Sequence, residues 1–369
     1  MNKNKNVWER MKDNNSMKKF ADFTVKQQMD HEFKVNYAYK VAWEFIEETS
    51  KLGLDTYVSV GGLDSLTLYA FLKDIGIKVP AVSVSHIEHK SIQEIHKKLG
   101  VICCLPAKRR DGTRWSKTSI INECGFPIGS KEISQKIATL QHPTERNKTS
   151  RHAIITGECG AYGGNKKESR MKLSQRWLNK FGGYENENEG VNYEIPDFKV
   201  SSKCCNYLKE KPCKDWAKKN NAVPFMGLMA SEGGRRSKTL KLNGCNYYGV
   251  KNIRSAPFAI FNRQDILQLA LDLNVEVPSV YGTIERKEDG TLYTTKAQRT
   301  GCSMCGYGVH LEKRPHRFDL LRKDNYKEWK YWMYDCYTSD SGEKFGYGHV
   351  LDYIGVKWED DIFVDKLKK

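Results

Sequence analysis

The sequence Asp55-Thr-Tyr-Val-Ser-Val-Gly-Gly-Leu-Asp-Ser65, followed by the apolar segment Leu66 to Lys73, gives the clearest indication of the fold class of this chain. Its first half is rich in β-branched and aromatic residues and predicts a short strand, whereas the apolar segment predicts a helix. Gly61 and Gly62 would let the backbone approach an anion closely, and a helix that begins near Ser65 would turn its N–H groups toward that anion. The stretch therefore predicts a phosphate-binding corner, although an ordinary tight turn would have the same composition.

The alternation of strands and helices continues on both sides of this corner. Further strands are predicted at Ala81–Ser85, Val101–Leu105, Ala153–Thr156 and Pro224–Met229, and further helices at Lys34–Glu48, Ser91–Leu99 and Arg263–Leu273. Apolar strands separated by amphipathic helices predict an α/β fold, in which a parallel twisted sheet is covered by helices on both faces.

Composition limits the class of partner. The chain has 369 residues and a formal net charge of +16, which indicates a polyanionic partner: nucleotide phosphates or a nucleic acid. A lysine-rich surface that only keeps the protein soluble is the alternative, because no basic stripe with interleaved aromatic residues stands out. No run approaches the ~20 apolar residues that span a bilayer, and residues 1–20 lack the apolar core of a signal peptide. We therefore expect a cytoplasmic protein without a membrane partner, and the oligomeric state stays open.

The corner resembles the pyrophosphate loop, Ser-Gly-Gly-x-Asp-Ser, of the adenine nucleotide α-hydrolase superfamily, which includes the ATP pyrophosphatases and the phosphoadenylyl-sulfate (PAPS) reductases. The match runs from Gly61 to Ser65, whereas Val60 replaces the first serine of the motif. The lysine of a Walker A sequence is missing. The resemblance implies that ATP, PAPS or adenylyl sulfate (APS) binds here, with Asp64 as a catalytic residue that organises the loop or a magnesium ion. The candidate nucleotide-binding residues of this loop are Ser59, Gly61, Gly62, Leu63, Asp64 and Ser65.

Two later segments combine an acidic residue with glycines and cations. One contains Gly157 and Glu158 after an apolar run, and the other is Gly227-Leu-Met-Ala-Ser-Glu-Gly-Gly-Arg-Arg236. Ligands of parallel sheets bind beyond the carboxyl ends of the strands, where both segments are expected. The candidate residues are Gly157, Glu158, Glu232, Gly233, Gly234, Arg235 and Arg236, and Arg235 is the candidate catalytic cation that clamps phosphate or sulfate. A surface ion network is the alternative interpretation.

These segments also resemble the PAPS reductase family, and the resemblance covers most of residues 50–320. It implies an adenine nucleotide α-hydrolase-like domain. We therefore expect a charged leader over residues 1–33, a nucleotide-binding α/β domain over 34–285, and a smaller cysteine-containing part over 286–369.

Five cysteines stand in positions that suggest a metal centre: Cys204, Cys205, Cys245, Cys302 and Cys305. The pair Cys302-Ser-Met-Cys305 presents two thiolates to one centre, which needs two more ligands. The order Cys-Cys, long interval, Cys-x-x-Cys resembles the [4Fe–4S] site of adenylyl-sulfate reductases, and Cys245 is a fifth candidate that could displace Cys204. A zinc site and plain buried cysteines are the alternatives.

Two chemistries follow from the family resemblance. A sulfonucleotide reductase uses a mobile cysteine near its C-terminus, but the last cysteine of this sequence is Cys336 and the family's terminal Glu-Cys-Gly stretch is missing. ATP-dependent sulfur transfer to a larger acceptor such as a nucleic acid, supplied by a sulfur donor protein, fits the glycines, the cysteines and the net charge. A non-catalytic nucleotide-binding partner protein is the third possibility, because Val60 removes a hydroxyl near the phosphates.

Overall fold

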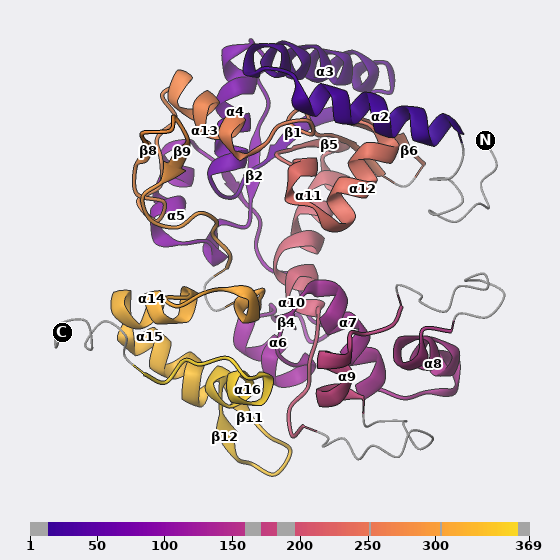
Figure 1. The fold of residues 1–369 in the computed structure, drawn as a ribbon, viewed down its shortest axis with the longest axis vertical. Coiled ribbons are helices and arrows are strands. Elements are labelled where there is room, and N and C mark those ends of the chain that lie inside the picture. Colours follow the sequence, from indigo (N-terminus) through magenta and orange to yellow (C-terminus); the bar gives the residue numbers. More distant parts are fainter. Residues whose placement is uncertain (1–13, 159–170, 183–195, 251, 303–304, 361–369) are drawn as a thin grey trace. The chain divides into compact units, whose positions relative to one another are not determined.

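The computed structural model describes residues 14–158, 171–182, 196–250, 252–302 and 305–360 (Figure 1). The side chains of residues 14–16 and of Arg235 lie outside the description. The chain divides into two compact units: unit 1 is residues 1–105 with 211–302, and unit 2 is residues 106–210 with 303–369. This division differs from the predicted boundaries at 33 and 285, because residues 106–210 join a core of their own with the C-terminal segment.

Unit 1 contains a six-stranded sheet with the order β3-β2-β1-β5-β7-β6. The strands are β1 (Asp55–Ser59), β2 (Ala81–Ser83), β3 (Ile102–Cys103), β5 (Ala222–Met226), β6 (Asn246–Gly249) and β7 (Asn252–Ser255). All neighbours pair in parallel except β6 and β7, which are antiparallel. The predicted α/β class is therefore confirmed, with a mixed, mostly parallel sheet at its centre.

The helices of unit 1 pack against the sheet on both faces. Tyr57 and Val58 are successive residues of β1 and so point to opposite faces. Val58 belongs to the core cluster that includes Phe45 and Phe71, whereas Tyr57 packs edge-on against Trp216, with ring centroids 5.1 Å apart. The helical elements are α2 (Asn14–Gln28), α3 (His31–Lys51), α4 (Leu63–Asp74), η1 (Ser85–Ile87), α5 (Lys90–Lys98), α11 (Lys211–Lys219), η5 (Ala230–Glu232), α12 (Gly234–Asn243) and α13 (Arg263–Asp272). A hairpin of β8 (Ile284–Arg286) and β9 (Leu292–Thr294) follows α13.

Unit 2 is mainly helical and has an aromatic core that includes Phe126, Phe181, Phe198, Phe318 and Tyr347. Its helical elements are α6 (Lys117–Cys124), α7 (Lys131–Gln141), η2 (Glu145–Asn147), α8 (Lys148–Thr156), α9 (Gln175–Phe181), α10 (Lys203–Cys205), η4 (Asn206–Glu210), η6 (Val309–Leu311), α14 (Arg317–Asp324), α15 (Tyr326–Lys330), η7 (Tyr331–Asp335) and α16 (Tyr347–Ile354). Short strands pair β4 (Ile128–Gly129) with β10 (Gly306–Tyr307) in parallel, and β11 (Tyr337–Thr338) with β12 (Lys344–Phe345) antiparallel.

The strand and helix predicted on either side of the glycines are present, and the helix begins at Leu63, two residues before the start expected near Ser65. One other strand prediction is wrong, and a second is confirmed only in part. Residues 153–156 form the last turn of α8 and not a strand, because a four-residue apolar run has no period that separates the two. Residues 101–105 hold only a two-residue strand at the sheet edge, where Ile102 is 40% exposed. Residues 14–28, which belong to the segment predicted as a charged leader, form helix α2.

None of the helices in the described ranges is both long and apolar enough to cross a membrane.

Candidate functional site

The glycine corner lies where the strand order of unit 1 reverses. From β1 the chain continues to β2 and β3 on one side of the sheet, and later to β5 and β7 on the other side, so β1 and β5 are parallel neighbours at the reversal. The loop after β5 touches the corner, because a Cβ atom on Gly227 would lie 3.2 Å from the carbonyl oxygen of Asp64. Open α/β sheets bind their ligands beyond the carboxyl ends of the strands at such a reversal.

The amides of the corner make hydrogen bonds with the protein's own hydroxyl groups. Ser65 Oγ accepts from the Gly61 N–H at 2.7 Å and donates to the Gly62 carbonyl oxygen at 2.9 Å. The Leu63 N–H donates to Tyr281 Oη at 3.2 Å, and Thr300 Oγ1 lies 2.7 Å from the same hydroxyl. These oxygens accept from backbone N–H groups as phosphate oxygens do in a nucleotide-binding loop. A phosphate that used the same two amides would therefore have to displace Ser65 Oγ and Tyr281 Oη.

Gly62 has no room for a side chain. A Cβ atom at this position would lie 2.1 Å from Tyr281 Oη and 3.1 Å from Thr300 Oγ1. Tyr281 itself is buried, and burial raises the pKa of its phenol. The glycine is therefore required by the approach of a neutral tyrosine, a constraint that the sequence pattern alone did not indicate.

A buried histidine fixes the other side of the loop. His96 Nε2 lies 2.9 Å from the Gly61 carbonyl oxygen, and His96 Nδ1 lies 2.7 Å from Ser85 Oγ. Burial lowers the pKa of His96, which favours the neutral ring. Because a carbonyl oxygen only accepts, Nε2 carries the proton and Nδ1 accepts from Ser85. This contact ties the segment after β2 to the loop after β1.

Two carboxylates and three guanidinium groups surround the start of α4. Arg263 forms an ion pair with Asp64, and Glu232 lies 2.5 Å from Arg236 and 3.6 Å from Arg299. Burial raises the pKa of Asp64, an effect that the charges of Arg263 and Arg299 oppose. Two further nitrogens of Arg263, Nε and Nη2, are buried without a hydrogen-bond partner among the described residues. A third carboxylate, Glu88, lies beside Gly61, where a Cβ atom would be 3.8 Å from its Oε1 atom, so the three guanidinium groups face three carboxylates. The unused donors of Arg263 are the feature of the corner that suits an anion.

The structure brings only part of the predicted nucleotide set together. Ser59, Gly61, Gly62, Leu63, Asp64 and Ser65 form the corner, and Glu232 and Arg236 lie beside it through the charge network. Gly233 and Gly234 begin α12, with positive φ angles of 77° and 59°. Arg235 lies on α12, but its side chain is not described.

Gly157 and Glu158 belong to unit 2 and not to the unit that holds the corner. Gly157 ends α8 in the left-handed conformation, with φ of 86°, and Glu158 contacts His152 at 3.0 Å on the surface. Because no strand precedes them, the argument from a strand's carboxyl end does not apply to these two residues.

Sequence reasoning missed five residues that lie at the corner but come from distant parts of the chain: His96, Arg263, Tyr281, Arg299 and Thr300.

Three of the five candidate metal ligands gather in unit 2. Burial raises the pKa values of Tyr307 and Tyr347, and the charges of Cys204 and Cys305 raise both further. Cys205 adds to the effect on Tyr307. Since these are electrostatic effects of nearby groups, all three thiols lie near Tyr307, and Cys204 and Cys305 also lie near Tyr347.

The other two candidates lie elsewhere. Cys245 is buried in the core of unit 1 beside Tyr37, and burial raises its pKa to about 11. Cys302 is the last residue of unit 1, and the described chain resumes at Cys305. Among the residues that the structure describes, no group of three His, Cys, Asp or Glu side chains is arranged to hold a metal ion. Cysteine thiols are the ligand type that an iron–sulfur cluster or zinc takes, but Cys204, Cys205 and Cys305 are not arranged as a metal centre in the described part of the chain.

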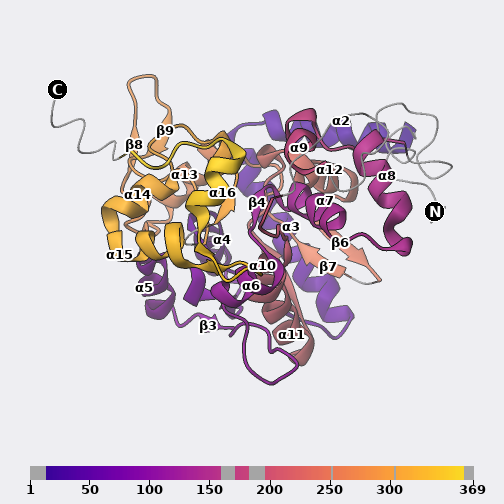
Figure 2. The ribbon, with the colours of Figure 1, turned by 90° about the horizontal axis from the view of Figure 1, so that it is seen from below.

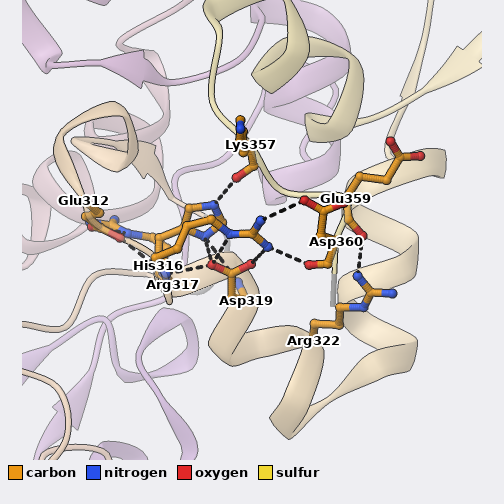
Figure 3. Close-up of polar contacts among 9 residues, drawn as sticks. Glu312, His316, Arg317, Asp319, Arg322, Lys357, Glu359 and Asp360 are labelled. Atoms are coloured by element: carbon orange, nitrogen blue, oxygen red, sulfur yellow. Dashed lines mark hydrogen bonds and ion pairs between the residues drawn. The ribbon is translucent and has the colours of Figure 1, made fainter. Parts of the chain in front are cut away.

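The basic segment before α14 is paired internally (Figure 3). His316 caps α14 and places its Nε2 atom 2.9 Å from the Lys357 carbonyl oxygen. Arg314 donates to both carboxylate oxygens of Asp319, at 3.2 and 2.6 Å. Arg317 pairs with Glu312 and donates to the Cys305 carbonyl oxygen at 3.0 Å. These side chains hold the C-terminal part of unit 2 together, and Arg317 positions the backbone of Cys305.

No protein-family model matches this chain, and no curated protein matches it either.

Proposed function

We propose that unit 1 binds an adenine nucleotide by its phosphates at the corner formed by Gly61 to Ser65. The observation that carries this proposal is the position of a glycine loop and a helix start at the strand-order reversal between β1 and β5. The guanidinium groups of Arg263, Arg299 and Arg236 provide cations for a polyphosphate at this site. An adenine nucleotide α-hydrolase-like fold, with ATP or a sulfonucleotide as ligand, is the specific form of this proposal.

In the proposed reaction, ATP activates an acceptor for sulfur transfer. An acceptor oxygen attacks the α-phosphorus, the bond between the α and β phosphates breaks, and pyrophosphate leaves. A persulfide from a sulfur donor protein then attacks the activated carbon or phosphorus, and AMP leaves with the acceptor oxygen. A second thiol of the donor protein cleaves the resulting S–S bond, so that a thiolate stays on the acceptor and a disulfide forms on the donor protein. Arg263 and Arg299 would offset the charge on the phosphates, and Asp64 would organise the loop or a magnesium ion, for which it must exchange its Arg263 partner. Arg235 is retained as a candidate catalytic cation on the same helix as Arg236.

The cysteine thiols of unit 2 are proposed as ligands of the metal centre that takes part in sulfur transfer. Cys204, Cys205 and Cys305 would contribute ligands to a [4Fe–4S] cluster or, as the alternative, to zinc. Cys302, the further ligand that the sequence predicts, is the last residue of unit 1. When bound, an iron–sulfur cluster supplies a centre that binds and passes on sulfide. Arg317 supports this site by holding the backbone carbonyl of Cys305.

Reduction of a sulfonucleotide is the second candidate, and one observation disfavours it. Cys336 is 1% exposed, its Sγ lies 3.2 Å from the Trp332 carbonyl oxygen, and burial raises its pKa to about 12. A thiol in that state is neither ionised nor mobile, whereas attack on the sulfur of PAPS requires a thiolate. A binding protein without turnover is the third candidate, because Val60 stands in place of the loop serine.

One experiment separates these candidates. The protein is purified without oxygen, its iron, zinc and acid-labile sulfide are measured, and it is then titrated with ATP and with PAPS in a calorimeter. Release of AMP and pyrophosphate supports transfer, sulfite formed from PAPS and thioredoxin supports reduction, and binding without turnover supports the third candidate. No heat with either nucleotide overturns the proposal. Gly61→Ala is the matched variant, because its Cβ atom would lie 3.8 Å from Glu88 and so fits the fold, yet it stands where a phosphate would approach.

A further inference from the structure

The segment that enters unit 2 after β3 forms a short hairpin of unusual charge. Residues 106–117 read Pro-Ala-Lys-Arg-Arg-Asp-Gly-Thr-Arg-Trp-Ser-Lys, with five cations and one carboxylate. Lys108 and Arg114 pair as an antiparallel bridge, and the Arg109 N–H donates to the Thr113 carbonyl oxygen at 2.7 Å. Figure 2 draws this segment as the loop between β3 and α6. The cations are therefore held on an ordered two-stranded ribbon.

The ribbon has an inner face that anchors it to unit 2. Trp115 stacks on Tyr207 of η4, with ring centroids 4.6 Å apart and the ring planes 1° from parallel. Arg109 lies over the Trp115 ring at 4.8 Å and pairs with Glu123 of α6 at 2.6 Å. The Trp115 N–H donates to the Ala107 carbonyl oxygen at 3.0 Å. An aromatic stack and an ion pair thus fix the position of the hairpin.

The outer face of the ribbon presents three exposed cations. Lys108, Arg110 and Arg114 are exposed, whereas Arg109 and Trp115 are half-buried. Lys108 and Arg114 share a face as bridge partners, and Arg110 belongs to the turn in which the Gly112 N–H donates to the Arg109 carbonyl oxygen at 3.2 Å. Lys108 and Arg114 stand directly opposite each other in the bridge, an arrangement of like charges that is unfavourable unless an anion lies between them. The Arg114 guanidinium donates to the Pro106 carbonyl oxygen at 2.7 Å, which holds it on the ribbon without neutralising it.

The carboxylates near the hairpin do not neutralise this face. Asp111 accepts from the Thr113 N–H and hydroxyl at 2.9 and 2.6 Å and so stabilises the turn. Glu123 is occupied by Arg109, which belongs to the inner face. What remains on the outer face is a fixed row of cations, and this pattern suits closely spaced phosphodiesters better than an isolated ligand.

We propose that the outer face formed by Lys108, Arg110 and Arg114 binds the phosphate backbone of a nucleic acid. The inference deepens the proposed function, because it gives the nucleic-acid acceptor a contact surface, and as an acceptor site it rests on that function. The binding itself requires no ATP, so it is tested separately. The sequence pattern alone did not indicate this surface. Trp115 and Tyr207, whose stacked rings hold the hairpin in place, lie far apart in the sequence.

The test measures the affinity of the whole chain for a fluorescent RNA of roughly 20 nucleotides by anisotropy, over a series of salt concentrations without ATP. The variant Lys108→Gln, Arg110→Gln, Arg114→Gln is compared with Lys214→Gln, Lys218→Gln, Lys219→Gln, which removes the same charge from exposed positions of α11 in unit 1. We expect the hairpin variant to lower the slope of log K against log salt by about 2, because each phosphate contact contributes roughly 0.7 to that slope for a single strand. The α11 variant should keep the slope.

Equal losses in the two variants would show that only diffuse charge is sensed, and no binding by the wild-type chain would remove the surface altogether; either result overturns the inference. A DNA duplex of the same length in a second series distinguishes single from double strands. Unfolding curves of both variants establish that they are folded, and Trp115 and Tyr207 are left intact for this purpose. A calorimetric ATP titration of the hairpin variant reports on the proposed nucleotide site independently, so that a failure of one proposal does not disguise a failure of the other.

Discussion

Arg263, the first residue of α13, forms an ion pair with Asp64 in the first turn of α4, although 199 residues separate them in the sequence. The pair links the strand-order reversal to the helix that follows β7. Burial raises the pKa of Asp64, and the charge of the Arg263 guanidinium opposes this effect.

Replacement of Arg263 should weaken nucleotide binding. Arg263→Gln removes a cation and its unused donors from the corner, and we expect ATP affinity to fall by about tenfold, which corresponds to about 1.4 kcal/mol. Calorimetric titration measures this change. Arg286→Gln is the matched control, because Arg286 is exposed on β8 and contacts only Gly290 and Gln268 among the described residues. Equal losses of affinity in both variants would contradict a specific role for Arg263.

Gly62 and Tyr281 should be coupled in stability. Gly62→Ala forces a methyl group to within 2.1 Å of Tyr281 Oη, so we expect the free energy of unfolding to fall by about 1–3 kcal/mol. Tyr281→Phe removes that oxygen, and the nearest remaining ring atom is then Cζ at 3.3 Å. In a double-mutant cycle followed by urea unfolding, the double variant should be more stable than the sum of the single effects predicts. Simple additivity would show that the contact at Gly62 does not constrain the loop.

A buried ion pair should control the docking of α3 onto α13. Lys34 Nζ lies 2.8 Å from Asp265 Oδ2, and both side chains are less than a tenth exposed. Asp265→Asn leaves the Lys34 ammonium without an opposite charge, so we expect unfolding to become easier by about 3 kcal/mol. Denaturation at neutral pH measures the loss. Adding Lys34→Met to Asp265→Asn should restore part of the stability, because no buried charge then remains uncompensated. If the double variant is no more stable than Asp265→Asn alone, the loss comes from the cap of α13 and not from the ion pair.

The ion pair between His31 and Asp265, next to Lys34, should make the free energy of unfolding depend on pH. Asp265 lies 3.5 Å from His31 and raises its pKa above the ordinary 6.5. Burial alone would raise the pKa of Asp265, but His31 and Lys34 outweigh it and hold the pKa below the ordinary 3.8. The His31 contribution is therefore complete below pH 6.5 and lost as pH rises through its folded pKa, whereas the Asp265 contribution is complete above pH 3.8 and lost as pH falls. His31→Gln should abolish the alkaline loss in unfolding curves, and an unchanged pH profile would contradict this assignment.

Thiol labelling should distinguish two cysteines of opposite environment. Cys336 is buried with a pKa of about 12, whereas Cys103 is exposed at the sheet edge. In the native protein we expect an alkylating reagent to modify Cys103 rapidly and to leave Cys336 unmodified until urea is added. Peptide mass spectrometry gives both rates, and Cys103→Ser identifies the fast site. Rapid modification of Cys336 in the folded protein would reopen the reductase interpretation.

Local patterns allowed the corner to be predicted, and contacts between distant residues could not be. The β-branched run, the two glycines and the apolar helix are adjacent in sequence, and each predicts its own element. Tyr281 reaches Leu63 across 218 residues, and no local period indicates such a contact. The run at residues 153–156 was too short to separate a strand from a helix end, so the two candidates behind it, Gly157 and Glu158, were placed in the wrong setting.

The predicted domain boundaries differ from the two units of the structure because residues 106–210 share a core with the C-terminal segment. The alternation of predicted strands and helices places residues 106–210 in the α/β domain. Their aromatic residues instead pack with those of the C-terminal segment, for example Phe126 against Tyr347 at 5.0 Å between ring centroids. Composition does not reveal which of two cores a buried aromatic residue joins.

Unit 1 is built from two segments of the chain, and residues 106–210 are synthesised between them. β5 pairs with β1 along its whole length, yet β5 begins at Ala222, after all of residues 106–210 have been made. A nascent chain that has emerged from the ribosome only as far as Glu210 carries β1 with one flank unpaired, and such an edge invites intermolecular pairing. Ribosome-bound chains of that length should therefore need chaperone protection that chains extended past Met226 do not.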